Sequence, residues 1–282
     1  MDEVLTKLRN LAITMTRGPE EQCRGNGALT IVDQGVISSD SSRGAFMPAL
    51  TPLPDVTWLA CQHVGEGLGT PDNHIERLRS TDQGKSWSNQ GSIHGGKQPR
   101  DGWAYRGPQI SAVPDGRLVM TATRFESNGL LFNTESEALQ RPEMLLFWSE
   151  NLGRTWSDPQ VVPHGLPADC YTANGAGTML QLAPDRWMYP FETWKPDGHD
   201  GPPDQKAGAL FSRDKGKSWS ELVVVADDPS GARQLPGGAH ADRLREAGRN
   251  VLARRRSAHL FLVYGAGDHA HEVGAVVVVL NR

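Results

Sequence analysis

The stretch S-T-D-Q-G-K-S-W at residues 80–87 decides the fold, because the same pattern returns twice further along the chain. Residues 149–156 read S-E-N-L-G-R-T-W and residues 212–219 read S-R-D-K-G-K-S-W, so the three copies align without gaps. Their first residues are 69 and 63 positions apart. Self-similarity at this spacing indicates a chain built from repeated supersecondary units.

Each position of the motif suits a tight turn. Asp or Asn at the third position can accept hydrogen bonds from backbone amides two or three residues further on. Glycine at the fifth position adopts a positive φ at little cost. The final tryptophan can fill the gap between adjacent sheets while its N–H bonds to a carbonyl. We therefore expect structural roles for the third and last residues of each copy: Asp82, Trp87, Asn151, Trp156, Asp214 and Trp219.

A second marker keeps step with the first, because Pro-Asp pairs stand at 54–55, 114–115 and 184–185. Strand-sized apolar or alternating segments lie between the markers, and no helical period appears between residues 28 and 230. The expected strands are 57–63, 75–79 and a weak one near Gly91, then 109–113, 117–124, 144–148 and 160–162, then 187–192, 207–211 and 222–226. Four short strands per unit predict an all-β protein made of propeller blades.

The composition excludes several functional classes. A net charge of −4 and a pI near 6.1 argue against a nucleic-acid partner. The three cysteines form no C-x-x-C pair, so neither a zinc site nor a disulfide framework is expected. The longest apolar run, 275–280, is only strand-sized, and the first residues lack the apolar core of a signal peptide. We expect no cofactor, no membrane span and a cytoplasmic location.

The repeated turn resembles the Asp-box (BNR) repeats of sialidases and related glycosidases, over roughly residues 29–228. The resemblance implies a sialidase-like β-propeller, six-bladed in the family, with Asp-box turns between the third and fourth strands and away from the active site. At about 65 residues per unit, this chain holds about four blades, or an incomplete propeller. Strand edges left open by an incomplete propeller favour association with other chains.

The two ends of the sequence depart from the repeat. Residues 1–28 are expected to form a poorly ordered N-terminal extension. Residues 229–282 show no fourth Asp-box, although 259–264 and 273–280 have the pattern of strands. This segment is a degenerate blade, the end of a fragment, or the product of a changed reading frame, and the sequence leaves the three open.

Sialidase-type chemistry needs an arginine cluster for the substrate carboxylate, and the family's first arginine lies in a Phe/Tyr-Arg-Ile-Pro motif. The matching place reads Ala45-Phe46-Met47-Pro48, with phenylalanine where arginine is expected. Arg43, three residues before Phe46, either substitutes for the missing arginine or is simply an exposed arginine of a loop. Tyr105-Arg106-Gly107-Pro108 occupies the equivalent place in the second unit, so Arg106 is the best candidate for binding an anion.

The resemblance also implies an acidic residue on the loop after the second strand, here residues 65–74. Asp72 is the best-placed aspartate and Glu66 the alternative. Glu192 ends the equivalent strand of the third unit, and Arg124 and Glu126 end that of the second, which indicates either a shared catalytic rim or a salt-bridged one.

Aromatic residues at the same strand ends are either a sugar-stacking wall or packing between blades; they are Trp103, Tyr105, Tyr171 and Trp194. The run His269-x-His271-Glu272 lacks a third ligand, so no metal site is expected. Sialidases use a tyrosine nucleophile, and Tyr264, the one tyrosine after Tyr189, does not match the family pattern.

The leading functional prediction is a sialidase-like exo-glycosidase that removes terminal acidic sugars from glycans, or a truncated and inactive form of one. A non-catalytic propeller that binds carbohydrate or protein is the alternative from another class. A same-fold glycosidase or lyase acting on another sugar is the third.

Overall fold

The structure, a computed structural model, describes residues 29–93, 102–113, 115–201, 206–220, 222–226, 259–265 and 272–280. Within these ranges the chain forms strands and turns, without a helix. Accordingly, no helix of membrane-spanning length and apolarity is found in the described ranges.

Three antiparallel sheets correspond to the three repeat units. Blade 1 consists of β2 (Gly44–Pro52), β3 (Trp58–Gly65), β4 (His74–Ser80) and β5 (Ser88–Ser92). Blade 2 consists of β6 (Trp103–Ala112), β7 (Leu118–Glu126), β10 (Glu143–Ser149) and β11 (Gln160–Val162). Blade 3 consists of β12 (Thr172–Ala176) and β13 (Leu180–Ala183), both paired with β14 (Arg186–Trp194), then β15 (Ala207–Ser212) and β16 (Val223–Ala226). The four-stranded blades predicted from the sequence are confirmed.

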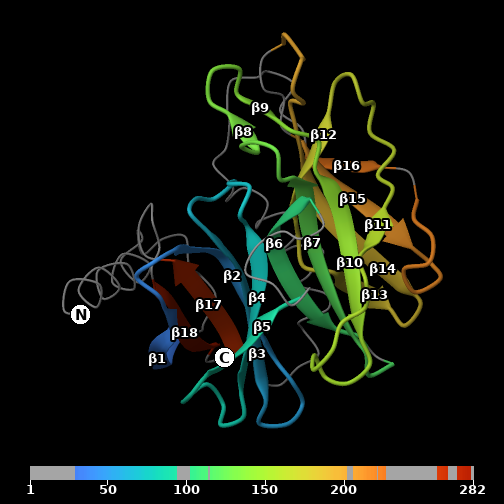
Figure 1. Ribbon diagram of the computed structural model, residues 1–282. Coiled ribbons are helices and arrows are strands. Elements are labelled where there is room, and N and C mark those ends of the chain that lie inside the picture. The colour runs from blue at the N-terminus through green and yellow to red at the C-terminus, as the bar shows by residue number, and fades with distance from the viewer. Residues whose placement is uncertain are drawn as a thin grey trace, which may run out of the picture.

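The blades stand side by side as a fan, with β2, β6 and β12 as their inner strands (Figure 1). Apolar side chains from facing sheets fill the space between blades: one cluster includes Cys61, Tyr105 and Phe147, and the next includes Leu146 and Tyr189. Burial of these faces on both sides of blade 2 is the main stabilising contribution. The packing fixes the angle between blades and brings the inner strands together.

A further sheet lies on the other side of blade 1. It contains β1 (Leu29–Ser39), β18 (Glu272–Leu280) and β17 (His259–Gly265), and β17 lies against β2 (Figure 1). The strands expected at 259–264 and 273–280 are therefore confirmed. The first strand of the described chain pairs with the last and not with blade 1. Three blades and this sheet make an incomplete propeller.

The repeated turns connect the third and fourth strands of each blade, as expected. In the first turn, Gly84 N–H donates to Ser80 Oγ (2.7 Å) and Ser86 N–H donates to Asp82 Oδ1 (2.9 Å). The glycines have φ of 88°, 78° and 83° in the three copies. The Asp or Asn accepts from the amide four residues further on in all three turns, and Asp214 also accepts from the amide three residues on, at 3.1 Å, as predicted.

The tryptophans that end these turns differ from the prediction. Trp87 Nε1–H donates to the Gly84 carbonyl at 3.1 Å, as expected. The indole nitrogens of Trp156 and Trp219 are buried without a partner among the described residues, because these rings pack into the clusters between blades. The ring fills space in each turn, and the N–H bond is not required for that.

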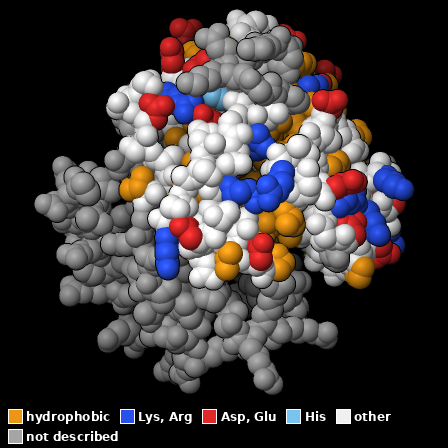
Figure 2. All heavy atoms as spheres, turned by 60° about the horizontal axis from the view of Figure 1, so that its bottom comes forward, with side chains coloured by type: hydrophobic (Ala, Val, Ile, Leu, Met, Phe, Trp, Pro, Cys, Tyr) orange, Lys and Arg blue, Asp and Glu red, His pale blue; other side chains and the backbone are white. Residues whose placement is uncertain are grey.

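The later turns are bound by the preceding blade. Arg77 and Arg79 of β4 donate to the carbonyls of Arg154 and Leu152 in the second turn. Gln160 of β11 donates to the Gly216 carbonyl in the third turn at 3.4 Å. Figure 2, which turns the lower end of the molecule forward, shows Lys and Arg side chains interspersed with Asp and Glu side chains. This face has the character of a solvated structural end.

Candidate functional site

Arg106 lies where the three inner strands converge. Its Nη1–H donates to Asn174 Oδ1 of blade 3 at 3.2 Å, and its Nη2 lies 3.7 Å from Met47 Sδ of blade 1. A β-bulge sets this position: Arg106 pairs with Thr123 and Gln109 with Thr121, so residues 107 and 108 oppose a single residue of β7. Such bulges re-aim side chains. One guanidinium thus contacts both neighbouring blades, which places it at the centre of the fan.

The surroundings of Arg106 are poor in protein partners. The side chain is buried, and burial lowers its pKa to about 10, which the nearby Glu192 carboxylate opposes. Its Nε–H has no partner among the described residues, and neither has the buried Thr123 Oγ1 of the adjacent strand. Buried polar groups are normally hydrogen-bonded, so these two atoms mark a place for a ligand oxygen or an ordered water.

Asp72 lies on the loop between β3 and β4, as predicted. Its Oδ2 accepts from Glu66 N–H at 3.0 Å, while its Oδ1 is buried without a partner in the described part of the chain. The next residue, Asn73, accepts from Tyr105 N–H through its carbonyl at 2.9 Å. Because Tyr105 precedes Arg106, the Asp72 loop is joined directly to the strand that carries the arginine. Glu66 closes this loop through its backbone.

Glu192 comes to the same centre from blade 3. It pairs with Asn174 across β12 and β14, and Asn174 in turn accepts from Arg106. The electrostatic interaction between Glu192 and Arg106 links both charged groups. The structure therefore brings together two of the predicted residues, Arg106 and Glu192, and attaches the loop of the third, Asp72.

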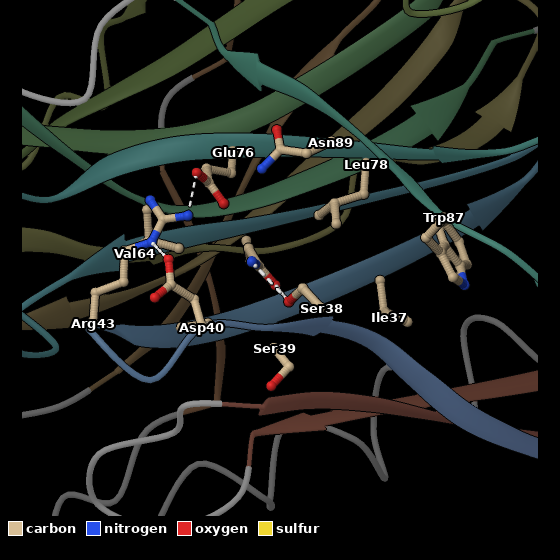
Figure 3. Close-up of a pocket in the computed structure, with 12 residues that line it drawn as sticks. Ile37, Ser38, Ser39, Asp40, Arg43, Val64, Glu76, Leu78, Trp87 and Asn89 are labelled. Atoms are coloured by element: carbon tan, nitrogen blue, oxygen red, sulfur yellow. Dashed lines mark hydrogen bonds and ion pairs between the residues drawn. The ribbon is translucent and has the colours of Figure 1, made fainter.

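Arg43 lies on the opposite face of blade 1. Its Nη2 lies 2.6 Å from Glu76 Oε1 and its Nε lies 2.8 Å from Asp40 Oδ2. Figure 3 shows it at one end of a cavity of about 270 Å³ between β1 and blade 1, lined also by Ser38 and Trp87. This cavity faces away from blade 2. The structure does not bring Arg43 to the Arg106 site.

Arg124 and Glu126 form a separate group at the end of β7. Arg124 bonds Glu143 Oε2 through Nε (2.7 Å) and Nη2 (2.6 Å), and its guanidinium stacks 4.2 Å from the Trp103 ring. Glu126 is exposed and accepts from Asn128. Because Arg124 is already neutralised and stacked, this group has the salt-bridged form, which is one of the two alternatives predicted for it.

The aromatic residues are engaged in packing. Tyr105 is buried against Phe147, with ring centroids 6.4 Å apart. Trp194 donates to the Glu137 carbonyl, and Tyr171 packs against the cluster between blades 2 and 3. The buried Tyr189 donates to backbone carbonyls, and burial raises the pKa of its hydroxyl. The shared position of these aromatics at one end of the blades therefore reflects contacts between blades and loops.

The loops at this end are linked in series. Leu131 N–H donates to the Gly69 carbonyl, and Leu139 N–H donates to the Lys195 carbonyl, at 2.9 and 3.0 Å. The loop between β7 and β10 of blade 2 carries β8 (Phe132–Asn133) and β9 (Ala138–Leu139) (Figure 1). Backbone bonds of this kind hold the rim of the site in one arrangement.

Sequence reasoning missed three members of this centre: His63, Thr123 and Asn174. Asn174 was detectable, because it holds in blade 3 the place that Arg106 holds in blade 2. Thr123 lies opposite Arg106 on the neighbouring strand, and His63 lies opposite Phe46, which holds the same place in blade 1. The described ranges hold no group of three His, Cys, Asp or Glu side chains suited to a metal ion, and His269 and His271 lie outside them.

No protein-family model and no curated protein sequence matches the chain. Among solved structures, a protein of unknown function from Dyadobacter fermentans is similar at 18% identity and a TM-score of 0.55, over 71% of this chain and 60% of that one. An alpha-L-arabinanase of Penicillium chrysogenum complexed with arabinobiose is similar at 18% identity and a TM-score of 0.50, over 71% of this chain and 56% of that one. A family 117 glycoside hydrolase of Zobellia galactanivorans is similar at 13% identity and a TM-score of 0.50, over 70% of this chain and 61% of that one.

These likenesses show the fold, a β-propeller that also occurs in glycoside hydrolases. The chain spans less than two thirds of the length of each of the three.

Proposed function

We propose that this chain acts on carbohydrate as a glycoside hydrolase, at the site formed by Arg106, Glu192 and the Asp72 loop that is joined to them, and that its substrate is a terminal acidic sugar of the sialic acid type. The observation that carries the proposal is the Arg106 guanidinium, which joins three inner strands and keeps a buried Nε–H without a partner among the described residues. A guanidinium fork suits a carboxylate through two parallel hydrogen bonds.

The three residues have separate roles in the proposed reaction. Arg106 holds the carboxylate of the sugar. Asp72 donates a proton to the glycosidic oxygen as the bond to the anomeric carbon breaks and its electron pair passes to that oxygen. Glu192 accepts a proton from the water that attacks the anomeric carbon. Paired carboxylates of this kind are the usual acid and base in glycosidases.

A non-catalytic sugar-binding propeller is the second candidate. It is favoured by the state of the other predicted arginines, because Arg43 and Arg124 are each ion-paired away from Arg106. A site with one arginine would bind an acidic sugar more weakly than a cluster would, and a single guanidinium is sufficient for recognition without turnover.

The test measures release of a fluorogenic aryl sialoside, with a neutral aryl arabinofuranoside as comparison. Asp72→Asn should lower kcat by about 10²- to 10⁴-fold, the usual contribution of a general acid. Arg106→Met should raise KM for the sialoside at least about tenfold and leave the arabinofuranoside unchanged. Arg117→Met, at the opposite end of blade 2 and paired with Asp115, is the matched control and should leave both substrates unaffected.

Binding of sialic acid without turnover, weakened by Arg106→Met, would favour the second candidate. Turnover of the sialoside insensitive to both Asp72→Asn and Arg106→Met would refute the site assignment. Turnover of the neutral substrate alone would retain the enzyme and remove the acidic sugar.

A further inference from the structure

His63 of β3 lies between the two parts of the candidate site. Its ring is completely buried; Gly107 N–H donates to Nδ1 at 3.2 Å, and Nε2–H donates to the Leu68 carbonyl at 3.1 Å. A carbonyl can only accept and a backbone amide can only donate, so these partners specify the neutral ring with its proton on Nε2.

Each ring nitrogen fixes a different component. Gly107 follows Arg106 in the bulge of β6, so the bond to Nδ1 sets the backbone that aims the guanidinium. Leu68 belongs to the loop that ends at Asp72, and its carbonyl also accepts from Asn73 Nδ2 at 3.0 Å. The bond from Nε2 therefore anchors the loop that bears the acid.

We propose that His63 is a positioning residue, which holds the anion-binding arginine and the acid-bearing loop in one fixed geometry through its two ring nitrogens. The inference rests on the proposed function for its catalytic consequences, while its structural content stands on the two hydrogen bonds. His63 itself touches no substrate.

The neutral form required for this role is stable. Burial, together with the charges of Arg106 and His74, lowers the pKa of His63 to about 3. The ring is further held by stacking on Phe46, with centroids 5.4 Å apart. Its orientation and tautomer are therefore constant over the pH range in which a glycosidase would work.

Two substitutions separate the two bonds. In His63→Asn the amide oxygen can replace Nδ1 as the acceptor for Gly107, but the side chain is too short to reach Leu68. In His63→Gln the amide N–H can replace Nε2–H toward Leu68, but no acceptor remains near Gly107. We expect His63→Asn to lower kcat by about 10- to 100-fold with KM little changed, because a misplaced acid slows the chemical step. We expect His63→Gln mainly to raise KM, by about tenfold, because the arginine is misplaced.

His63→Phe keeps a stacked ring and removes both bonds, so both parameters should change. His164→Asn is the matched control: His164 Nδ1 accepts from Leu166 N–H outside the site, and the asparagine should leave kcat and KM unchanged. If Asn and Gln at position 63 change kcat and KM in the same proportion, the positioning role is wrong and His63 only stabilises the fold.

An NMR measurement keeps the inference testable if the wild-type chain neither turns over nor binds a sialoside. His63→Asn should then shift the amide signals of residues 66–72 more than that of Gly107, and His63→Gln should do the reverse. That crossed pattern would retain the positioning role while the proposed function fails. Equal disturbance of both regions by both variants would overturn the positioning role whatever the activity.

Discussion

The inner strands of blades 1 and 2 have the same bulge and carry different chemistry. Phe46 pairs with His63 and Ala49 with Cys61, just as Arg106 pairs with Thr123 and Gln109 with Thr121. The residue after each bulge position is left-handed, Met47 at φ 46° and Gly107 at φ 60°. Blade 1 thus repeats the backbone of blade 2, but with an apolar side chain and a strained non-glycine residue.

The side chain at the bulge position has a packing role in blade 1 and a polar role in blade 2. In blade 1, Phe46 stacks on His63 and packs over Gly44, where a Cβ atom would lie only 2.5 Å from the phenyl ring. In blade 2, the equivalent side chain reaches toward two other blades. The bulge supplies direction, and the residue placed on it decides whether the centre of the fan is filled or charged.

The largest expected effect comes from making blade 1 resemble blade 2. Phe46→Arg should lower the free energy of unfolding by about 3 kcal/mol, because it buries a second guanidinium near Arg106 without a carboxylate partner. Phe46→Leu, which loses only the stacked ring, should lose about 1 kcal/mol. Urea unfolding measures both. Added sialic acid should restore part of the stability of Phe46→Arg and none of that of Phe46→Leu; equal losses in the two variants would contradict the equivalence of the bulges.

The comparison also shows what a sequence can reveal. The place of Arg106 is predictable from the sequence, because Tyr105-Arg106-Gly107-Pro108 resembles the family's arginine motif and matches Ala45-Phe46-Met47-Pro48 in the first unit. Partners across sheets left none: Glu143 beside Arg124 and His63 beside Gly107 come together only through strand register and blade packing. Arg43 shows the same limit, since it lies in the turn before β2 and its partners Asp40 and Glu76 come together only in the folded sheet.

The next effect tests the left-handed position of blade 2. Gly107→Ala should destabilise the fold by about 1–2 kcal/mol, because an L side chain at φ 60° is strained. Gly129→Ala, without a positive φ and with its nearest contact at 3.5 Å, is the control and should change stability by less than about 0.5 kcal/mol. Equal changes in thermal unfolding would show that the bulge tolerates a side chain.

A pH titration of stability tests the residue between the two bulges. The pKa of His63 is about 3 in the folded chain, whereas its ordinary value, which applies to the unfolded chain, is 6.5. Between these two pH values the unfolded chain therefore binds one more proton than the folded chain does. The contribution of His63 to the free energy of unfolding is therefore fully present above pH 6.5. It should fall by about 1.4 kcal/mol per pH unit as the pH drops through this window. Urea unfolding of wild type and His63→Phe between pH 4.5 and 7 isolates the contribution, and identical slopes would argue against a buried neutral ring.

The smallest expected effect returns to Met47, the strained counterpart of Gly107. Met47→Gly relieves the left-handed strain, but it removes the thioether contact with Arg106 and frees the unfolded chain, so the net change should stay within about 1 kcal/mol. Met47→Ala keeps the strain and loses the same contact, and it should be the less stable of the two by about 1 kcal/mol. Chemical unfolding of both variants measures the difference. If alanine proves more stable than glycine here, the backbone of blade 1 is not held in the conformation that blade 2 reaches through Gly107, and the two bulges are equivalent only in register.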